Sequence, residues 1–202
     1  LTTMNLKTGA PTFGTPEANL SALAIGQLCR RLGLPLRCGG HLTASKCGDG
    51  QAMQESADSM MAGLLAGANY VLHAAGWLEG GLSMGYEKFV MDCDHLGMMH
   101  RFTAGLDLAE EEFGLDAFKE VGPGNHFLGC AHTQERFKTA FYDSALNCNK
   151  SFEQWSDEGG LDAAQRANVL WKKVLAEFEA PALDTGIDEA LQEFMAKRKA
   201  AL

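Results

Sequence analysis

The sequence lacks several of the patterns that mark common classes of protein. No apolar run reaches the roughly 18 to 20 residues that span a bilayer, and the N-terminus has no basic segment followed by an apolar one. Basic residues are also scarce, since 17 lysines and arginines stand against 26 aspartates and glutamates among 202 residues, a net charge of -9. A nucleic-acid backbone would be repelled by such a chain. We therefore expect a cytoplasmic protein that binds neither membranes nor nucleic acid.

Two familiar site motifs are missing as well. No C-x-x-C pair occurs, so a structural zinc site has no strong signal. No G-x-G-x-x-G opens a helix, which argues against dinucleotide binding. The six cysteines are scattered, and in a chain without an export signal we expect reduced thiols rather than disulfides. None of them has an evident histidine partner in the sequence, so nucleophilic hydrolysis has little support.

What is present is the composition of a globular protein with one sizeable core, with 46% hydrophobic and 21% charged residues. In the first half, short apolar runs alternate with Gly-rich polar loops and helical patterns. A first expected strand ends near residues 4–6, and two more cover residues 35–39 and 68–75. Expected helices cover residues 16–32, 51–65 and 83–103. Successive strand–helix units imply right-handed parallel crossovers. The first half therefore predicts an α/β fold, either a doubly wound sheet or a (β/α) barrel.

The second half reads as helices alone. Expected helices cover residues 107–121, 134–142, 151–157, 161–180 and 187–200. A complete (β/α)8 barrel needs roughly 250 residues, so we expect half a barrel followed by a helical tail. We divide the chain into strand–helix units at 1–106 and a helical region at 107–202 that packs on the barrel. Because the chain opens at Leu1 in an expected strand, we also expect an upstream region to be missing or processed away.

Chemistry in parallel α/β folds is carried by the loops that follow the strand C-termini, and two such loops here are rich in polar groups. The first, residues 41–51, holds His41, Lys46, Asp49 and Gln51. Asp49 can equally cap the following helix, and Gln51 can pair along that helix. The first loop is thus either part of a site or a well-capped helix start, and Lys46 is the residue that capping explains least.

The second such region, called the second loop, covers residues 73–81, from the end of the third expected strand through the loop that follows it. His73 lies at the strand end and is followed by small residues that leave room for a ligand. Trp77 and Tyr70 can offer aromatic faces to a quaternary ammonium ion, and Glu79 can face its charge. The alternatives are a hydrogen-bonded structural histidine, aromatic side chains in the core and a solvated acid. The second loop is therefore a candidate cation site.

Metal binding is a further alternative for the histidines of the second half. His126, Cys130 and His132 lie close together in sequence, and His95 and His100 precede them. Their spacing matches no zinc motif. We therefore expect no metal site.

Several blocks in this order resemble the trimethylamine methyltransferase (MttB-like) family. The blocks cover nearly the whole chain and are Lys7-Thr8-Gly9-Ala10-Pro11, Phe13-Gly14-Thr15-Pro16-Glu17, Gly39-Gly40, Thr43-Ala44-Ser45-Lys46, Asp49-Gly50-Gln51-Ala52, Ala66-Gly67-Ala68-Asn69-Tyr70, His73-Ala74-Ala75-Gly76-Trp77-Leu78-Glu79-Gly80-Gly81, Tyr86-Glu87-Lys88-Phe89-Val90-Met91-Asp92, Val121-Gly122-Pro123-Gly124, His126-Phe127-Leu128 and His132-Thr133. Several linked blocks are far more specific than any one of them.

The resemblance implies a fold and a position within it. Members of the family are more than twice as long as this chain, and the resemblance falls on their C-terminal portion. It implies that the chain is the C-terminal part of a (β/α)8 TIM barrel followed by a helical C-terminal region.

The resemblance also implies an activity. Family members transfer a methyl group from a methylated or quaternary amine to the cobalt of a corrinoid (cobalamin) carried by a separate partner protein, so we expect no cofactor bound tightly by this chain. Some members carry pyrrolysine, whereas this sequence contains only the twenty ordinary residues. The chain therefore resembles the pyrrolysine-free branch, in which glycine betaine is a known type of substrate.

Within that activity, the loop residues receive expected roles. We expect His73, Glu79 and Lys46 to be catalytic, as orienting groups and charge partner. We expect substrate binding by Trp77, Tyr70, His41, Asp49 and Gln51. Two other functions remain open: a non-catalytic interaction module that docks on a corrinoid protein or pairs with a second copy of itself as a homo-oligomer, and a zinc-dependent methyltransferase.

Overall fold

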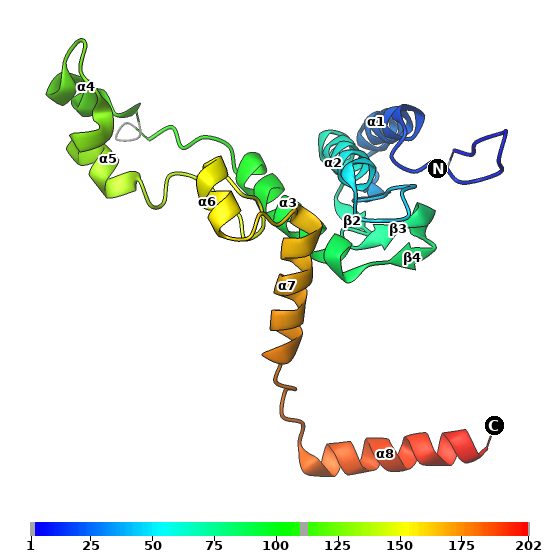
Figure 1. The fold of residues 1–202 in the computed structure, drawn as a ribbon. Helices are drawn as coiled ribbons and strands as arrows, with labels where there is room; N and C mark the ends of the chain where they lie inside the picture. The colour runs from blue at the N-terminus through cyan, green and yellow to red at the C-terminus, as the bar shows by residue number, and fades with distance from the viewer. Residues whose placement is uncertain (1–2, 110–112, 202) are drawn as a thin grey trace. The chain divides into compact units, whose positions relative to one another are not determined.

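The computed structural model describes residues 3–109 and 113–201 (Figure 1). The chain forms two units, Leu1–Trp171 and Lys172–Leu202. The strands are β1 (Arg37–Gly39), β2 (Tyr70–Leu72), β3 (Trp77–Leu78) and β4 (Ser83–Met84). The helices are α1 (Pro16–Leu32), α2 (Gly50–Leu65), the 3-10 turn η1 (Glu79–Gly81), α3 (Tyr86–Thr103), α4 (Leu115–Val121), the 3-10 turn η3 (Phe127–Gly129), α5 (Ala131–Arg136), α6 (Phe152–Asp157), α7 (Ala163–Ala176) and α8 (Thr185–Ala200).

Helix α1 begins and ends where its local sequence predicts. Thr15 adopts extended backbone before Pro16, whose fixed φ suits the first helical turn. Gly33 ends the helix at φ 66°, in the left-handed region that glycine enters without a steric penalty. The helix then packs against α2, as the neighbouring ribbons show (Figure 1).

Strands β1 and β2 form a parallel pair with α2 between them in sequence. Arg37 is opposite Tyr70, and Gly39 is opposite Leu72. The parallel strand–helix–strand unit expected from the sequence is thus confirmed, with strands shorter than expected. The arrangement is a mixed helical fold with little sheet, of α/β type.

The expected first strand at residues 4–6 is wrong. Met4 makes one antiparallel bridge to Pro11, and the Asn5 N–H donates to the Ala10 carbonyl at 2.9 Å. The segment therefore folds back on itself instead of joining β1 and β2. The parallel sheet has two strands in the described residues, and no closed barrel is present among them.

A short antiparallel hairpin, which the sequence did not predict, follows β2. Strands β3 and β4 pair Trp77 with Met84 and Leu78 with Ser83. The helix expected at 83–103 therefore begins at Tyr86, because its first residues belong to the hairpin.

Five helices are expected in the helical region, and the described residues there contain five α-helices, but two boundaries are wrong. Helix α4 covers only the end of the expected 107–121 helix; residues 107–109 are not helical, and residues 110–112 lie outside the described chain. Helix α5 precedes most of the expected 134–142 helix, because its N-cap is already at Cys130. Short amphipathic segments of this length are held by their caps and contacts more than by propensity.

The other three helices agree with expectation. A capping box joins Ser151 and Gln154 at the start of α6. Helix α7 begins after Asp162, which accepts the Gln165 N–H at 2.8 Å. In the second unit, Asp184 caps α8 by accepting two backbone N–H groups. No helix of the described residues is long and apolar enough to cross a membrane.

A small core ties the helical region to α3. It contains Met91 of α3, Leu146 of the loop before α6 and Ala167 of α7, all buried. Asp94 fixes that loop, since its carboxylate accepts the Ser144 hydroxyl at 2.6 Å and the Ala145 N–H at 3.0 Å. Helix α3 is therefore packed on this side and faces the candidate loops with other residues.

Candidate functional site

The two polar loops expected from the sequence lie side by side. The Glu79 N–H donates to the Ser45 carbonyl at 2.7 Å, and the Gly80 N–H donates to the Thr43 carbonyl at 2.8 Å. Thr43 and Ser45 are buried, so these bonds fix the backbone of the second loop on that of the first. The side chains that the loops carry are thereby brought into one region.

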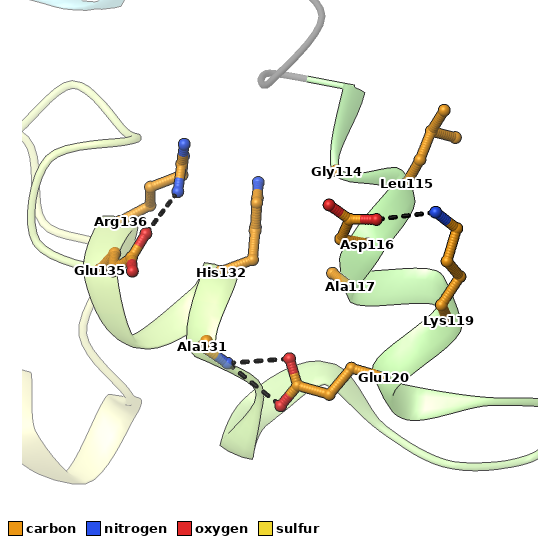
Figure 2. Close-up of a pocket in the computed structure, with 10 residues that line it drawn as sticks. All are labelled: Gly114, Leu115, Asp116, Ala117, Lys119, Glu120, Ala131, His132, Glu135 and Arg136. Carbon is orange, nitrogen blue, oxygen red and sulfur yellow. Dashed lines mark hydrogen bonds and ion pairs between the residues drawn. The ribbon is translucent and has the colours of Figure 1, made fainter.

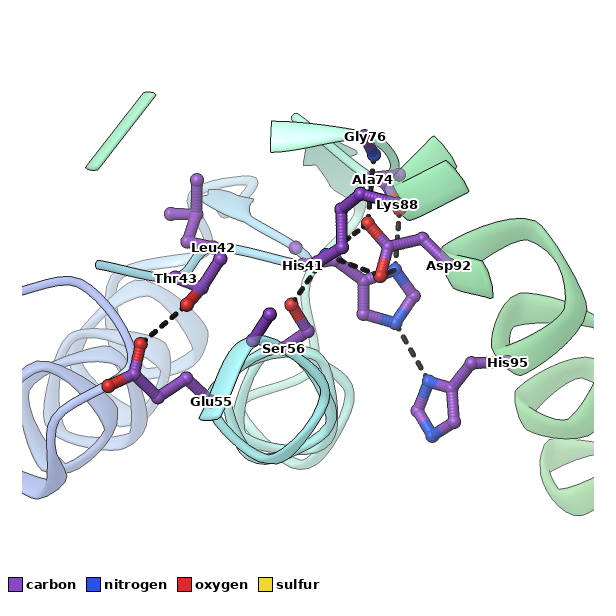
Figure 3. Close-up of polar contacts among 12 residues, drawn as sticks. His41, Leu42, Thr43, Glu55, Ser56, Ala74, Gly76, Lys88, Asp92 and His95 are labelled. Atoms are coloured by element: carbon purple, nitrogen blue, oxygen red, sulfur yellow. Dashed lines mark hydrogen bonds and ion pairs between the residues drawn. The ribbon is translucent and has the colours of Figure 1, made fainter. Parts of the chain in front are cut away.

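The first loop is anchored by a carboxylate on α2. Glu55 accepts the Thr43 hydroxyl at 2.6 Å and the Ala44 N–H at 2.8 Å (Figure 3). Gln51 donates to the other oxygen of Glu55 at 2.9 Å. Gln51 therefore pairs with Glu55 along the face of α2, which is the alternative role that the sequence left open for it.

Asp49 acts as the N-cap of α2. Its carboxylate accepts the Ala52 N–H and the Ser45 hydroxyl, each at 2.9 Å. These hydrogen bonds lower the pKa of the Asp49 carboxyl, and the bond from the Ala52 backbone N–H has the largest effect. Lys46 is exposed nearby and donates to the Ala44 carbonyl at 2.7 Å. Lys46 is therefore exposed and does not cap α2.

The second loop contains two residues with unusual backbone. His73, directly after β2, has φ 56°, and Glu79 has φ 52°; they are the two non-glycine residues with positive φ in the described chain. Such conformations cost on the order of 1–3 kcal/mol and gather at ligand sites. Both side chains are exposed. The rings of His73 and Trp77 meet edge to face, with centroids 4.8 Å apart, and Trp77 is half-buried.

Tyr70 lies at the other end of β2. It begins the strand that His73 follows, so the strand rise places the two roughly 10 Å apart along the backbone. Its side chain is 59% exposed. The structure therefore brings Trp77, His73 and Glu79 into one loop and leaves Tyr70 outside it.

His41, the first residue of the first loop, is fully buried. Its Nδ1 is 2.6 Å from the Ala74 carbonyl, and its Nε2 is 2.8 Å from Nδ1 of His95 (Figure 3). A carbonyl only accepts, so the proton of His41 is on Nδ1 and His95 donates to Nε2. Burial lowers the pKa of His41 to about 4. His41 is thus a neutral ring that holds the second loop at Ala74.

A buried ion pair on α3 holds the same loop one residue further on. Lys88 Nζ is 2.6 Å from Asp92 Oδ1 and 2.9 Å from the Ser56 hydroxyl, and both charged side chains are fully buried. The Gly76 N–H donates to Asp92 Oδ2 at 2.8 Å. Burial lowers the pKa of Lys88 and raises that of Asp92, and each charge opposes the shift of the other.

Lys88 and Asp92 had no expected role from the sequence. A signal was available, because Lys88, Asp92 and His95 are spaced four and three residues apart and so share one face of a helix. A lysine and an aspartate four residues apart, however, usually predict an ion pair on the exposed face of a helix. Only tertiary structure shows that α2 and the second loop cover them.

The histidines proposed as alternative metal ligands do not come together. The described residues contain no group of three or more His, Cys, Asp or Glu side chains that could hold a metal ion. His132 instead lines an open pocket of about 550 Å³ between α4 and α5, together with Asp116, Lys119 and Arg136 (Figure 2). Its Nε2 is buried without a hydrogen-bond partner among the described residues. His126 is exposed on the preceding loop.

The sequence also contains one serine motif that sequence reasoning missed. Gly81 to Gly85 has the spacing G-x-S-x-G, which in some hydrolases places a nucleophilic serine at a tight strand-to-helix turn. Here Ser83 lies in β4 and pairs with Leu78 across the hairpin. The motif therefore does not form a nucleophile elbow.

Comparisons with known proteins identify the family of this chain. Residues 1–202 match the profile of the family described as trimethylamine methyltransferase (MTTB). A glycine betaine methyltransferase of Desulfitobacterium hafniense (strain Y51) is 40% identical over 194 residues, which are 96% of this chain and 40% of that protein. Trimethylamine methyltransferase MttB2 of Methanosarcina mazei is 30% identical over 97% of the chain and 39% of its own length. MttB of Methanosarcina barkeri gives the same values.

The chain belongs to the trimethylamine methyltransferase family. It spans about two fifths of the length of these curated relatives.

Proposed function

We propose that the full-length protein transfers a methyl group from a quaternary or tertiary methylated amine, such as glycine betaine, to the cobalt of a corrinoid carried by a partner protein. The observation that supports this most is the 40% identity, over 96% of the chain, to a protein named glycine betaine methyltransferase. The meeting of the two polar loops adds support from this chain itself.

Recognition of the donor follows from its chemistry. A quaternary ammonium ion has no N–H to donate, so it is bound by aromatic faces and by negative charge. Trp77 would offer the face and Glu79 the charge, while Lys46 and His73 would meet the carboxylate of a betaine. The His73–Trp77 ring contact holds the indole at a fixed angle of 85° to the imidazole, which suits a preformed site.

With a quaternary donor the reaction depends on alignment more than on acid or base chemistry, whereas a tertiary amine must carry a proton on nitrogen to leave as a neutral amine. The carbon–nitrogen bond breaks with its electron pair staying on nitrogen, so a quaternary donor leaves as a neutral tertiary amine. Reduced cobalt supplies the electron pair of the new bond to carbon. Lys46, His73 and Glu79 are exposed in the described chain, which fits the approach of a large second reactant. These side chains would bind and orient the donor.

The other residues predicted to bind substrate would act indirectly, through the shape of the two loops. His41, Asp49 and Gln51 each bond to protein groups that shape the two loops. We propose that they keep the site in shape, and that any contact of Tyr70 with a donor would come from outside the second loop.

A spectroscopic assay tests the proposal. Full-length protein, its mass verified, is mixed with cob(I)alamin and either glycine betaine or trimethylamine. Donor-dependent formation of methylcobalamin supports the proposal, and the faster donor identifies the amine. A folded protein that forms no methylcobalamin from either donor, with or without a corrinoid protein, contradicts it. Zinc at one ion per chain in untagged protein would instead favour a zinc-dependent enzyme.

One observation favours a non-catalytic interaction module as the second candidate. Helix α8 exposes Ile187, Leu191 and Phe194 at helical spacing, so it has an apolar face that the second unit does not cover. A module of this kind would form a complex with a corrinoid protein, or with itself, in light scattering while giving no methyl transfer.

A further inference from the structure

The backbone of the loop that carries Trp77 is hydrogen-bonded to two buried side chains, those of Asp92 and His41. Asp92 accepts the N–H of Gly76, the residue directly before Trp77. His41 donates to the carbonyl of Ala74, two residues earlier. Both side chains are fully buried, so these bonds form away from competing water (Figure 3).

We propose that Asp92, kept in place by Lys88, is a positioning residue for the methyl-donor site, because it fixes the backbone of Gly76 and thereby the indole of Trp77. The inference rests on the proposed function for its link to the donor. Its structural part, the hold on the loop, stands without it.

The surroundings of Gly76 leave the loop little freedom to take another position. Gly76 has φ +86°, and a Cβ built there would lie 2.9 Å from the Met84 side chain and 3.2 Å from that of Phe89. The backbone thus passes close to the hairpin and to α3. Its buried N–H needs an acceptor, and Asp92 provides it.

Lys88 and Asp92 have separable tasks. The lysine donates to both Asp92 and Ser56 of α2, so it joins α2 to α3 and neutralises the carboxylate. The carboxylate alone contacts the loop. A pure structural ion pair would matter only through its charges, whereas a positioning role depends on an acceptor atom at the place of Oδ2.

Two double variants of the full-length protein separate these roles. Lys88→Met with Asp92→Asn removes both charges but keeps an oxygen that can accept from Gly76. Lys88→Met with Asp92→Leu removes the charges and the acceptor together. Ser56 loses the same lysine in both, so the acceptor is the difference between them.

The expected result is a split between the two variants. The leucine variant raises KM for glycine betaine about tenfold over the asparagine variant, because Trp77 is no longer held in place. Hydrogen–deuterium exchange of peptides over residues 73–80 is faster in the leucine variant alone. Equal KM and equal exchange in the two variants would overturn the proposal.

Two features keep the test decisive. If either variant fails to fold, native-state exchange of the unmodified protein still applies: the Gly76 amide should exchange only with global unfolding, and fast exchange would contradict the hold by Asp92. If the protein shows no methyl transfer at all, the exchange data still report on the loop. Failure of the proposed function and failure of the inference are therefore distinguishable.

Discussion

His41 Nε2 accepts a hydrogen bond from His95 Nδ1 at 2.8 Å, and this contact between two neutral rings predicts how stability depends on pH. Burial lowers the pKa of His41 to about 4, below its usual 6.5. The unfolded chain therefore binds the extra proton first, so stability is full above pH 6.5 and is lost as pH falls toward 4. The loss approaches about 3 kcal/mol.

Denaturant titrations of the full-length protein between pH 4 and pH 7.5 measure this slope. His41→Gln should flatten the curve in that range, at a cost in stability at neutral pH. His100→Gln serves as the control, because His100 is exposed and should leave the slope unchanged. His95, whose pKa burial also lowers, contributes a part of the slope that remains in His41→Gln. An unchanged slope in His41→Gln would assign the whole dependence to other groups.

The buried ion pair predicts a difference between single and double substitutions. Lys88→Met leaves the Asp92 carboxylate buried without its counter-charge and should lower the free energy of unfolding by about 3–5 kcal/mol. Adding Asp92→Leu should restore part of the loss, because it removes the buried charge but leaves the Gly76 N–H without its acceptor. Lys119→Met, which breaks an exposed pair with Asp116, should change stability by less than about 0.5 kcal/mol. Urea unfolding measures all three, and a double variant no more stable than the single one would contradict the reasoning.

The end of α1 offers a test of backbone conformation without packing effects. Gly33 has φ +66° and open space around its Cβ position. Gly33→Ala should therefore lower the free energy of unfolding by about 1–2 kcal/mol, through left-handed strain alone. Gly50 has equal space but no positive φ, so Gly50→Ala should be neutral or slightly stabilising. Equal effects at the two sites in urea unfolding would show that the helix end tolerates a side chain.

Features that depend on residues close together in the sequence could be predicted from it. Thr15, Pro16 and Gly33 set the ends of α1 by local chemistry, and the parallel pair followed from the alternation of apolar runs and helices. His73 was predicted at the C-terminal end of the third expected strand, and the structure places it one residue beyond the end of β2.

Features that depend on distant contacts could not be predicted. The strand expected at residues 4–6 turns back on its own segment, and the hairpin after β2 has strands too short to show a period of two. Lys88 and Asp92 have the spacing of a surface pair and are buried only because other elements cover them. The loop anchors of the site therefore emerged from tertiary structure alone.

The most direct test of the central claim is calorimetry of glycine betaine with full-length protein and two variants of Trp77. If the second loop binds the quaternary ammonium, Trp77→Ala should weaken binding about thirtyfold or more, as expected for loss of a desolvated cation–π contact. Trp77→Phe, which keeps an aromatic face, should retain most of the affinity. Unchanged affinity in a folded Trp77→Ala variant would contradict the account, because the donor would then bind elsewhere.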